Sequence, residues 1–515
     1  MNQGAGSIPR IGLNNAMQDI KELAYILNQH SLPVLNGNGQ PLEKDTLLWR
    51  LYEGIEKGQF LSDEEAELAL YPRDAGSNTK YRKLKSALRD RMLSTVVSFE
   101  PKGGRFTDYQ KAYYECHREW HIIKILSGQN ANTAAMGLAV KLLKQVQKYE
   151  FTLLTMDIAA YLAYQYGLRE SNDKKFREAN DLYTKGRILY DAECLAEQLY
   201  TELMVKVVNN RSVNQEVAQL ASRYYARIEE QMKEYHSYRL HLYGQMISLM
   251  RYSTINQYDA VLPICEKAIA YFEQKPYEAR IPLQMFSYQK MICHIQLRSF
   301  DEGKKVANYC LSLIEEGNFN WFKYMELYLQ LAFYTQEYGH GVEVIKKAIS
   351  HPRFQFLPEN TKELWRIYES FAYFLTKTNQ IQGGQLGKFK LNKFMNETPI
   401  FSKDKSGMNI AIIVVRLLFL LAEKSYKQIL DEVEAIEQYC YRYLTTKNTV
   451  RSASFIKMLL QIPHGQFDAS LVSKKAAKYR KVLDDYPLQV ANQTHEVEVI
   501  PYEELWEMVL PLLRK

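Results

Sequence analysis

Apolar residues recur at helical spacing along most of the chain, and few stretches alternate between apolar and polar residues as strands do. This pattern predicts an almost wholly helical protein, with one short strand near Val497–Ile500. We expect two helices near 14–29 and 43–57, followed by a short acidic helix and then a basic helix. Further helices are expected at 107–127, 132–148, 151–168, 173–208, 213–234, 237–254, 258–274, 281–297, 301–316, 320–337, 340–350 and 359–378. Two or three more follow to about residue 484, and a last one begins at Pro501.

An aromatic-led motif returns in the second half of the chain. It begins at Tyr258, Phe300, Tyr338 and Tyr426, in steps of 42, 38 and 88 residues, the last being two units of 44. Small or apolar residues stand seven and ten positions after each aromatic residue, namely Cys265, Ala307, Ile345 and Val433, then Ala268, Cys310, Ala348 and Ile436. A period near 40 in a helical background predicts stacked antiparallel helix pairs, an α-solenoid.

Glycine- and proline-rich stretches divide the chain. The stretch from Glu100 to Gly104 predicts the end of a small helical N-terminal domain, residues 1–100. Helical repeats are expected over 105–378, and a Gly- and Lys-rich insert over 379–408 interrupts them. Further repeats and a C-terminal capping helix are expected over 409–515.

Composition adds few constraints to this picture. A net charge of +7 over 515 residues is mild and does not predict a nucleic-acid-binding surface, which needs clustered basic residues. The six cysteines form no CxxC pair, and several fall on apolar stripes, which favours a reducing compartment over a disulfide framework. The N-terminal residues Met1 to Gly6 show no apolar core like that of a signal peptide, and the longest apolar stretch, Ile410 to Ala422, is too short to span a membrane. We therefore expect a cytoplasmic protein without membrane insertion.

The motifs at Tyr258-Asp259-Ala260 and Phe300-Asp301-Glu302 resemble the second helix of tetratricopeptide repeats. In that family an aromatic residue opens the helix and alanine recurs ten positions later, as Ala268 and Ala348 do here. The repeats are degenerate, because Val261 and Ile429 stand where a small residue is usual. The resemblance implies a protein or peptide partner, bound along a concave face, with no catalysis and no cofactor.

The register of this resemblance predicts a partner-binding site on the helix before Tyr338. It places the long polar side chains of Lys323, Glu326 and Gln330 in the concave groove, beside the aromatic anchor Phe333. Solvated side chains without a ligand would have the same pattern, and we weigh the two interpretations equally.

A second candidate surface is a basic amphipathic helix near the N-terminus. Its apolar face carries Tyr81, Leu84, Leu88 and Met92, and its basic face carries Arg82, Lys83, Lys85 and Arg89. The basic face could contact phosphates or an acidic protein, although a solvated outer face is the more common meaning of such a pattern.

Other candidate chemistry is weak. His117 and His121 have the spacing of a shared metal site, but no third ligand is evident and we predict no metal. The stretch 383–389 lacks the glycine spacing and the hydroxyl of a phosphate-binding loop. No catalytic residues or cofactor are predicted. We expect a non-catalytic protein- or peptide-binding scaffold, and rank below it a peptide- or ligand-responsive regulator whose basic N-terminal helices contact nucleic acid.

Overall fold

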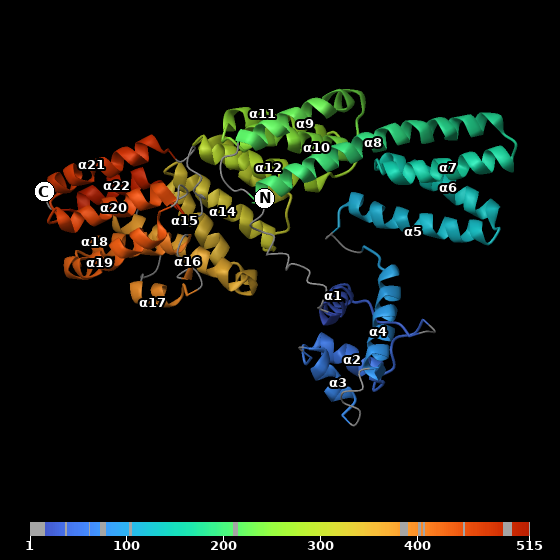
Figure 1. Ribbon diagram of the computed structural model, residues 1–515, viewed down its shortest axis with the longest axis horizontal. Coiled ribbons are helices and arrows are strands. Elements are labelled where there is room, and N and C mark those ends of the chain that lie inside the picture. Colours follow the sequence, from blue (N-terminus) through green and yellow to red (C-terminus); the bar gives the residue numbers. More distant parts are fainter. Residues whose placement is uncertain are drawn as a thin grey trace. The chain divides into compact units, whose positions relative to one another are not determined.

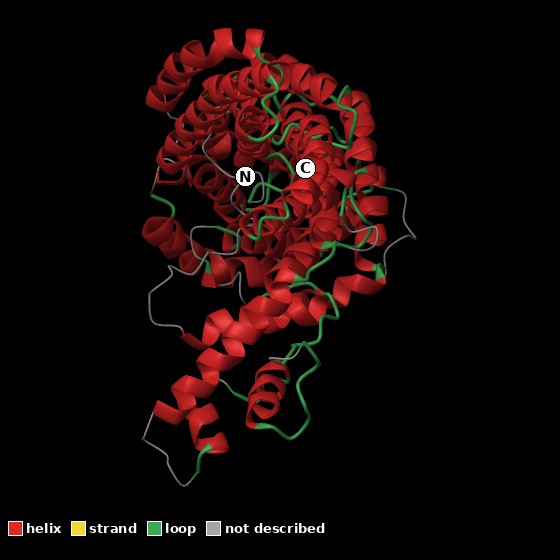
Figure 2. Ribbon diagram, turned by 90° about the vertical axis from the view of Figure 1, so that its right-hand side faces the viewer, coloured by secondary structure: helices red, strands yellow, loops and turns green. Residues whose placement is uncertain are grey.

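The computed structural model describes residues 16–36, 39–60, 62–72, 79–101, 106–209, 215–381, 390–399, 403–404, 407–445, 449–487 and 497–513. Within these ranges the protein is all-helical and has no β-strand, only an isolated bridge between Leu35 and Pro41 (Figure 2). The predicted all-α fold is confirmed. Among the helices described, none has both the length and the apolar character that crossing a membrane requires.

The chain divides into two compact units, residues 1–145 and 146–515, and the division falls within α6. The domain boundaries at residues 100, 378 and 408 remain predictions. The helices of the first unit are α1 (Ala16–Gln29), α2 (Leu47–Glu56), α3 (Asp63–Leu70), α4 (Thr79–Val97), α5 (Asp108–Gly128) and α6 (Asn132–Lys148).

Helices α1 to α4 surround a core of their own, to which Ile20, Leu51, Leu88 and Met92 contribute fully buried side chains. Local sequence sets where these helices begin, because the side chains of Thr46 and Ser62 accept backbone N–H groups at the N-termini of α2 and α3. The predicted apolar face of the basic helix α4 is confirmed.

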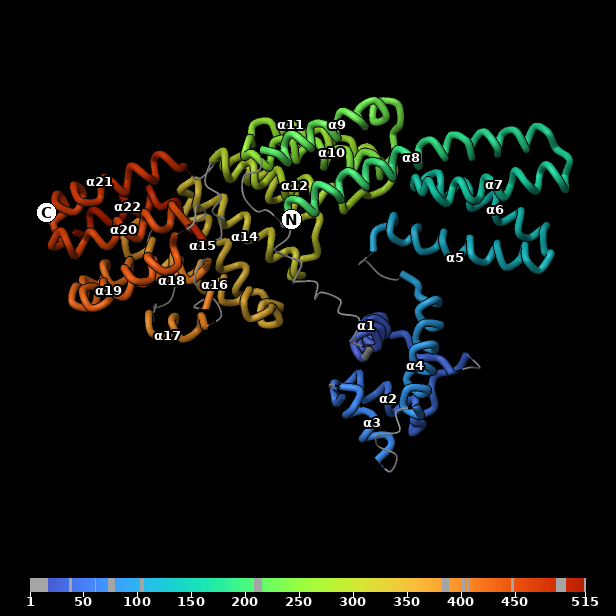
Figure 3. The backbone as a smooth tube through the Cα atoms, in the orientation of Figure 1, coloured from blue at the N-terminus to red at the C-terminus, as the bar shows by residue number. Residues whose placement is uncertain are grey.

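The second unit contains the long array of helices that can be followed from α7 to α22 in Figures 1 and 3. They are α7 (Thr152–Leu168), α8 (Asp173–Asn209), α9 (Gln215–Glu234), α10 (Tyr238–Ser253), α11 (Tyr258–Glu273), α12 (Arg280–Gln296), α13 (Phe300–Ser312), α14 (Phe319–Tyr334), α15 (Tyr338–Ile349), η1 (Pro352–Phe356), α16 (Glu359–Lys377), α17 (Leu391–Asn396), α18 (Asn409–Ala422), α19 (Tyr426–Tyr443), α20 (Val450–His464), α21 (Ala469–Asp485), α22 (Tyr502–Val509) and η4 (Leu510–Leu512).

Each helix of this unit packs mainly against its neighbours in the chain. Helix α10 packs against α11, α11 against α12, and α12 against both α13 and α14; α18 likewise packs against α19 and α20. Sequential antiparallel pairs of this kind form a solenoid-like array. The predicted stacking of helix pairs is confirmed at this level.

The four aromatic motifs each begin the second helix of a pair, α11, α13, α15 and α19. Two positions before each aromatic residue the backbone has a positive φ, at Asn256, Arg298, Gln336 and Lys424. The N–H directly before each aromatic residue donates to the carbonyl five positions earlier, over 2.8–3.0 Å. This is the hydrogen bond of a Schellman turn, so one turn geometry recurs with the sequence motif.

The small residues of the motif lie where helices approach closely. Ala268, Cys310 and Ala348 are fully buried. A Cβ atom at Gly303 would lie 2.6 Å from the side chain of Leu331, which shows how little room the contact leaves. Five of the six cysteines are buried and all six are free, as expected for small apolar residues of the core.

Candidate functional site

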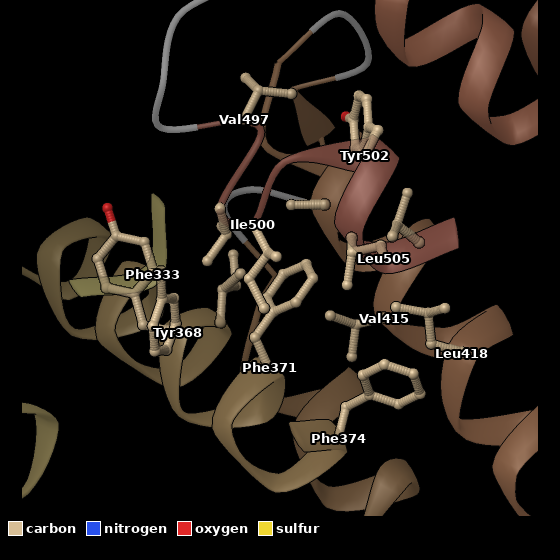
Figure 4. Packing of buried hydrophobic residues seen from close by; sticks show 14 of the residues in the cluster. Phe333, Tyr368, Phe371, Phe374, Val415, Leu418, Val497, Ile500, Tyr502 and Leu505 are labelled. Carbon is tan, nitrogen blue, oxygen red and sulfur yellow. The ribbon is translucent and has the colours of Figure 1, made fainter. Parts of the chain in front are cut away.

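Residues 497–513, called here the C-terminal segment, lie across one face of the helices α14, α16, α18 and α20. Figure 4 shows Val497, Ile500, Tyr502 and Leu505 of the segment among aromatic and aliphatic side chains of the array. We call this surface the covered face; its residues are Tyr334, Tyr368, Phe371, Phe374, Val415, Leu418, Arg451, Ser452 and Phe455.

The C-terminal segment has an extended part and a helical part. The expected strand near Val497–Ile500 is wrong, because no neighbouring strand pairs with these residues in the described structure. Side chains take the place of a strand partner: Tyr334 donates its hydroxyl proton to the carbonyl of Glu498 at 2.7 Å. Pro501 is the N-cap residue of α22, in which Tyr502, Leu505, Trp506, Met508 and Val509 are buried.

Arg451 holds the extended part of the segment from helix α20. Its side chain is 1% exposed, and that of its partner Glu498 is 0% exposed. The guanidinium donates to the Glu498 carboxylate at 2.6 and 3.0 Å, and to Glu503 at 2.8 Å. It also donates to the carbonyls of Leu483 and Tyr486, at 3.2 and 2.8 Å. All three guanidinium nitrogens are therefore bonded, as a buried charge requires.

The charges of Arg451, Glu498 and Glu503 compensate one another. Burial alone would lower the pKa of Arg451, but the carboxylates of Glu498 and Glu503 outweigh burial and raise it. Burial raises the pKa of the Glu498 carboxyl, and the guanidinium counteracts that effect. The backbone N–H of Tyr502 donates to the same carboxylate at 2.9 Å. Glu498 is thus recognised through a bidentate pair and one backbone donor.

The helical part of the segment makes two further anchoring contacts. Tyr502 stacks on Phe455 with ring centroids 4.4 Å apart, and its hydroxyl lies 3.0 Å from that of Ser452. Glu504 accepts hydrogen bonds at 2.9 Å from both Arg298 and Tyr338. The segment therefore links the turn between α12 and α13, and the start of α15, to α20.

The predicted partner site on α14 does not have the expected exposure. Glu326 is 4% and Gln330 2% exposed, and Phe333 is fully buried. Only Lys323 is partly accessible, and it pairs with Glu326 at 3.0 Å. Every residue from Tyr324 to Tyr334 is buried, because α14 has neighbours on all sides. The expectation that these side chains line an open groove is wrong.

Two of the four cations on the predicted basic face of α4 form ion pairs within the first unit. Lys85 forms an ion pair with Asp63 at 2.6 Å, and Arg89 forms one with Asp19 at 3.0 Å. Arg82 and Lys83 are exposed. Two of the four cations on the predicted basic face are therefore paired with carboxylates of the first unit.

The other chemical candidates are placed as follows. The ring of His117 packs against that of Tyr113, with centroids 4.5 Å apart, and burial lowers the pKa of His117. No cluster of three metal-ligating side chains occurs in the ranges that the structure describes. The stretch 383–389 lies outside the described residues.

A second buried polar cluster joins α7, α8 and α10. Glu193 on α8 is fully buried and accepts the hydroxyl proton of Thr152 at 2.7 Å and that of Ser237. Arg239 pairs with Glu197 and reaches Glu193 at 3.5 Å. Burial raises the pKa of Glu193. These partners come from the adjoining helix ends, so the cluster fixes the helices relative to one another.

His241 on α10 is a further buried titratable group. Its ring stacks on that of Tyr271, with centroids 3.9 Å apart, and its Nε2 lies 3.1 Å from the carbonyl of Tyr235. Burial lowers the pKa of His241 to about 4, and the charges of His236 and Lys275 act in the same direction. This histidine is neutral at neutral pH.

Arg451 and Glu498 were not predicted as a pair from the sequence. A signal was present, since Glu498 stands inside an aliphatic run and Arg451 begins a helix whose other residues are mostly apolar. Comparisons of the chain with protein-family models, with curated proteins and with solved structures gave no match.

Proposed function

We propose that this protein is a non-catalytic scaffold or adaptor of the cytoplasm, which binds another protein or a peptide through the face formed by the first helices of its repeats. We further propose that the repeats are of the tetratricopeptide type, which the aromatic motifs resemble. The proposal makes the covered face the binding surface; α14 contributes Tyr334 to it, and the predicted residues Lys323, Glu326, Gln330 and Phe333 are not part of it.

One observation carries this proposal. The covered face already binds a short segment of the same chain. Residues of this segment are far in sequence from residues of the face that they contact, since the Tyr334–Glu498 hydrogen bond joins residues 164 positions apart. Aromatic and aliphatic side chains provide apolar contact, and Arg451 provides a charged, directional contact. Peptide-binding grooves combine the same elements, a few anchors and a small number of oriented polar groups.

Cutting the chain between the array and the segment tests this function. A specific protease site placed within residues 488–496 allows the folded protein to be nicked, and a fluorescent peptide of residues 497–513 is then added. We expect the native fragment to stay bound and to exchange with the peptide in a saturable way, whereas the uncut protein takes up little. A nicked, folded array that loses its fragment and takes up no peptide would contradict the proposal.

The alternative is a regulator that binds nucleic acid through α4. Its support is limited to Arg82 and Lys83, because Lys85 and Arg89 are engaged by aspartates. Phosphate binding depends on the number of cations that can reach the backbone of the nucleic acid. Salt-sensitive binding of duplex DNA that disappears when Arg82 and Lys83 are replaced by alanine would favour this alternative.

A further inference from the structure

We propose that the C-terminal segment is a tethered occupant of the covered face, and that the face accepts in its place a protein segment of the same chemistry. That chemistry is a short aliphatic stretch with one central glutamate, followed by a proline-opened, acidic amphipathic helix. This inference rests on the proposed function and adds to it the class of partner and a means of regulation.

Charge complementarity defines the partner. Three glutamates of the segment, Glu498, Glu503 and Glu504, meet the two arginines Arg451 and Arg298. The bidentate bond to Glu498 fixes the position of one carboxylate, so a neutral or basic segment would leave the buried guanidinium without its counter-charge. The covered face therefore selects acidic segments.

The apolar contacts define the shape of the partner. Val497, Ile500, Leu505 and Val509 are buried, and they are divided between an extended stretch and one side of a helix. Pro501 sets the change from one to the other, since its fixed φ suits the start of a helix. A partner needs the same order of elements to place its apolar side chains.

Two buried polar atoms on α14 and α16 lie next to the covered face. Gln330 Oε1 lies one turn before Tyr334 on α14, and Trp365 Nε1 lies one turn before Tyr368 on α16. Both atoms are buried without a hydrogen-bond partner. Leaving buried polar groups unpaired is costly, and the tethered segment supplies neither of these two atoms with a hydrogen-bond partner.

Buried ion pairs also suit an exchangeable contact better than a permanent one. A buried pair often stabilises a fold no more than apolar residues of similar volume would, but it discriminates strongly between partners. The tether keeps the segment at an effective concentration on the order of 1 mM. A partner in solution at micromolar concentration therefore enters only when it binds more tightly or when the tethered segment is weakened.

The test uses the full chain and a fluorescent probe peptide with the sequence of residues 497–513, with binding measured by anisotropy. Leu505→Ala weakens the tethered segment without altering the covered face, and we expect the probe to bind it about 30-fold more tightly than it binds the unmodified chain. Pro511→Ala, at an exposed position of the same segment, is the matched control and should bind the probe as the unmodified chain does. Equal probe binding by all three proteins overturns the inference.

A second variant and a second probe complete the test. Glu498→Gln weakens the tether through its charge, so if Leu505→Ala loses helical content by circular dichroism, this second variant decides. A probe with all three glutamates replaced by glutamine should bind at least tenfold more weakly; equal binding overturns the acidic specificity. Dimerisation of Leu505→Ala by light scattering, without probe binding, would mean that the segment exchanges only between copies and also overturns the inference.

The outcome separates this inference from the proposed function. If the nicked chain exchanges its fragment but Leu505→Ala admits no probe, the covered face binds peptides and the segment is not a regulator. If the nicked chain also fails to exchange, the binding function itself is refuted.

Discussion

Replacing Arg451 by methionine should release the C-terminal segment. Methionine keeps much of the aliphatic volume of arginine but donates none of the five hydrogen bonds that Arg451 makes. The carboxylate of Glu498 then remains fully buried without its counter-charge. Breaking a buried pair on one side costs about 3–5 kcal/mol, a large part of the stability of any local unit.

Hydrogen-exchange mass spectrometry of the peptide that covers residues 497–513 measures this loss directly. A cost of about 3–5 kcal/mol raises the rate of amide exchange through local opening by roughly 10²- to 10⁴-fold. Removing both charges, in the double variant of Arg451→Met and Glu498→Met, should restore at least half of the lost protection, because no buried charge is then left unpaired.

Arg480→Met is the matched control, since Arg480 is partly exposed and reaches Glu507 at 3.4 Å. A surface pair of this kind is worth about 0–1 kcal/mol, so protection should hardly change. Unchanged exchange in Arg451→Met would contradict this expectation, and so would a double variant that loses as much protection as the two single variants added together.

Three further variants test the packing and the buried histidine. Gly341→Ala should destabilise the protein by about 1–3 kcal/mol in urea denaturation, because the new Cβ would lie 2.5 Å from the buried ring of Phe333. Its control Gly339→Ala meets no atom within 4 Å and should stabilise α15 by up to about 1 kcal/mol. Ala268→Phe overpacks a fully buried helix contact and should cost at least about 1–3 kcal/mol, against little change for Lys267→Phe at the exposed neighbouring position; an unchanged midpoint would mean that the repeat register is wrong. The stability that neutral His241 contributes is present above pH 6.5 and is lost as pH falls towards 4, because the unfolded chain binds the proton first. Replacing His241 by phenylalanine should therefore remove about 3 kcal/mol of the change in unfolding free energy between these two pH values.

Local sequence patterns predicted the helices of the array. The helix at Tyr258 begins where the motif places it, and so do those at Phe300, Tyr338 and Tyr426. Helical periodicity and turn residues act over a few positions, and the Schellman turns form within six consecutive residues. The long helix predicted at 173–208 is one uninterrupted helix, Asp173–Asn209.

The candidate site could not be predicted in the same way. The partners Arg451 and Glu498 are 47 positions apart in the sequence, and helical periodicity contains no information on such distant pairs. The error on α14 was avoidable in part. Glu326 and Gln330 stand in a helix that is apolar on all its other sides, and such a helix is usually buried rather than amphipathic.

The position of the C-terminal segment has a consequence for synthesis on the ribosome. Tyr334 leaves the exit tunnel 164 residues before Glu498, which corresponds to roughly 8–33 s at usual elongation rates of about 5–20 residues per second. During that interval Phe371, Phe374 and their apolar neighbours emerge one helix after another, before the segment that later covers them. Helical arrays otherwise mature repeat by repeat as they emerge. In this array the apolar face stays uncovered until the C-terminal segment has been synthesised. A chaperone that shields apolar surface has that period in which to act on it.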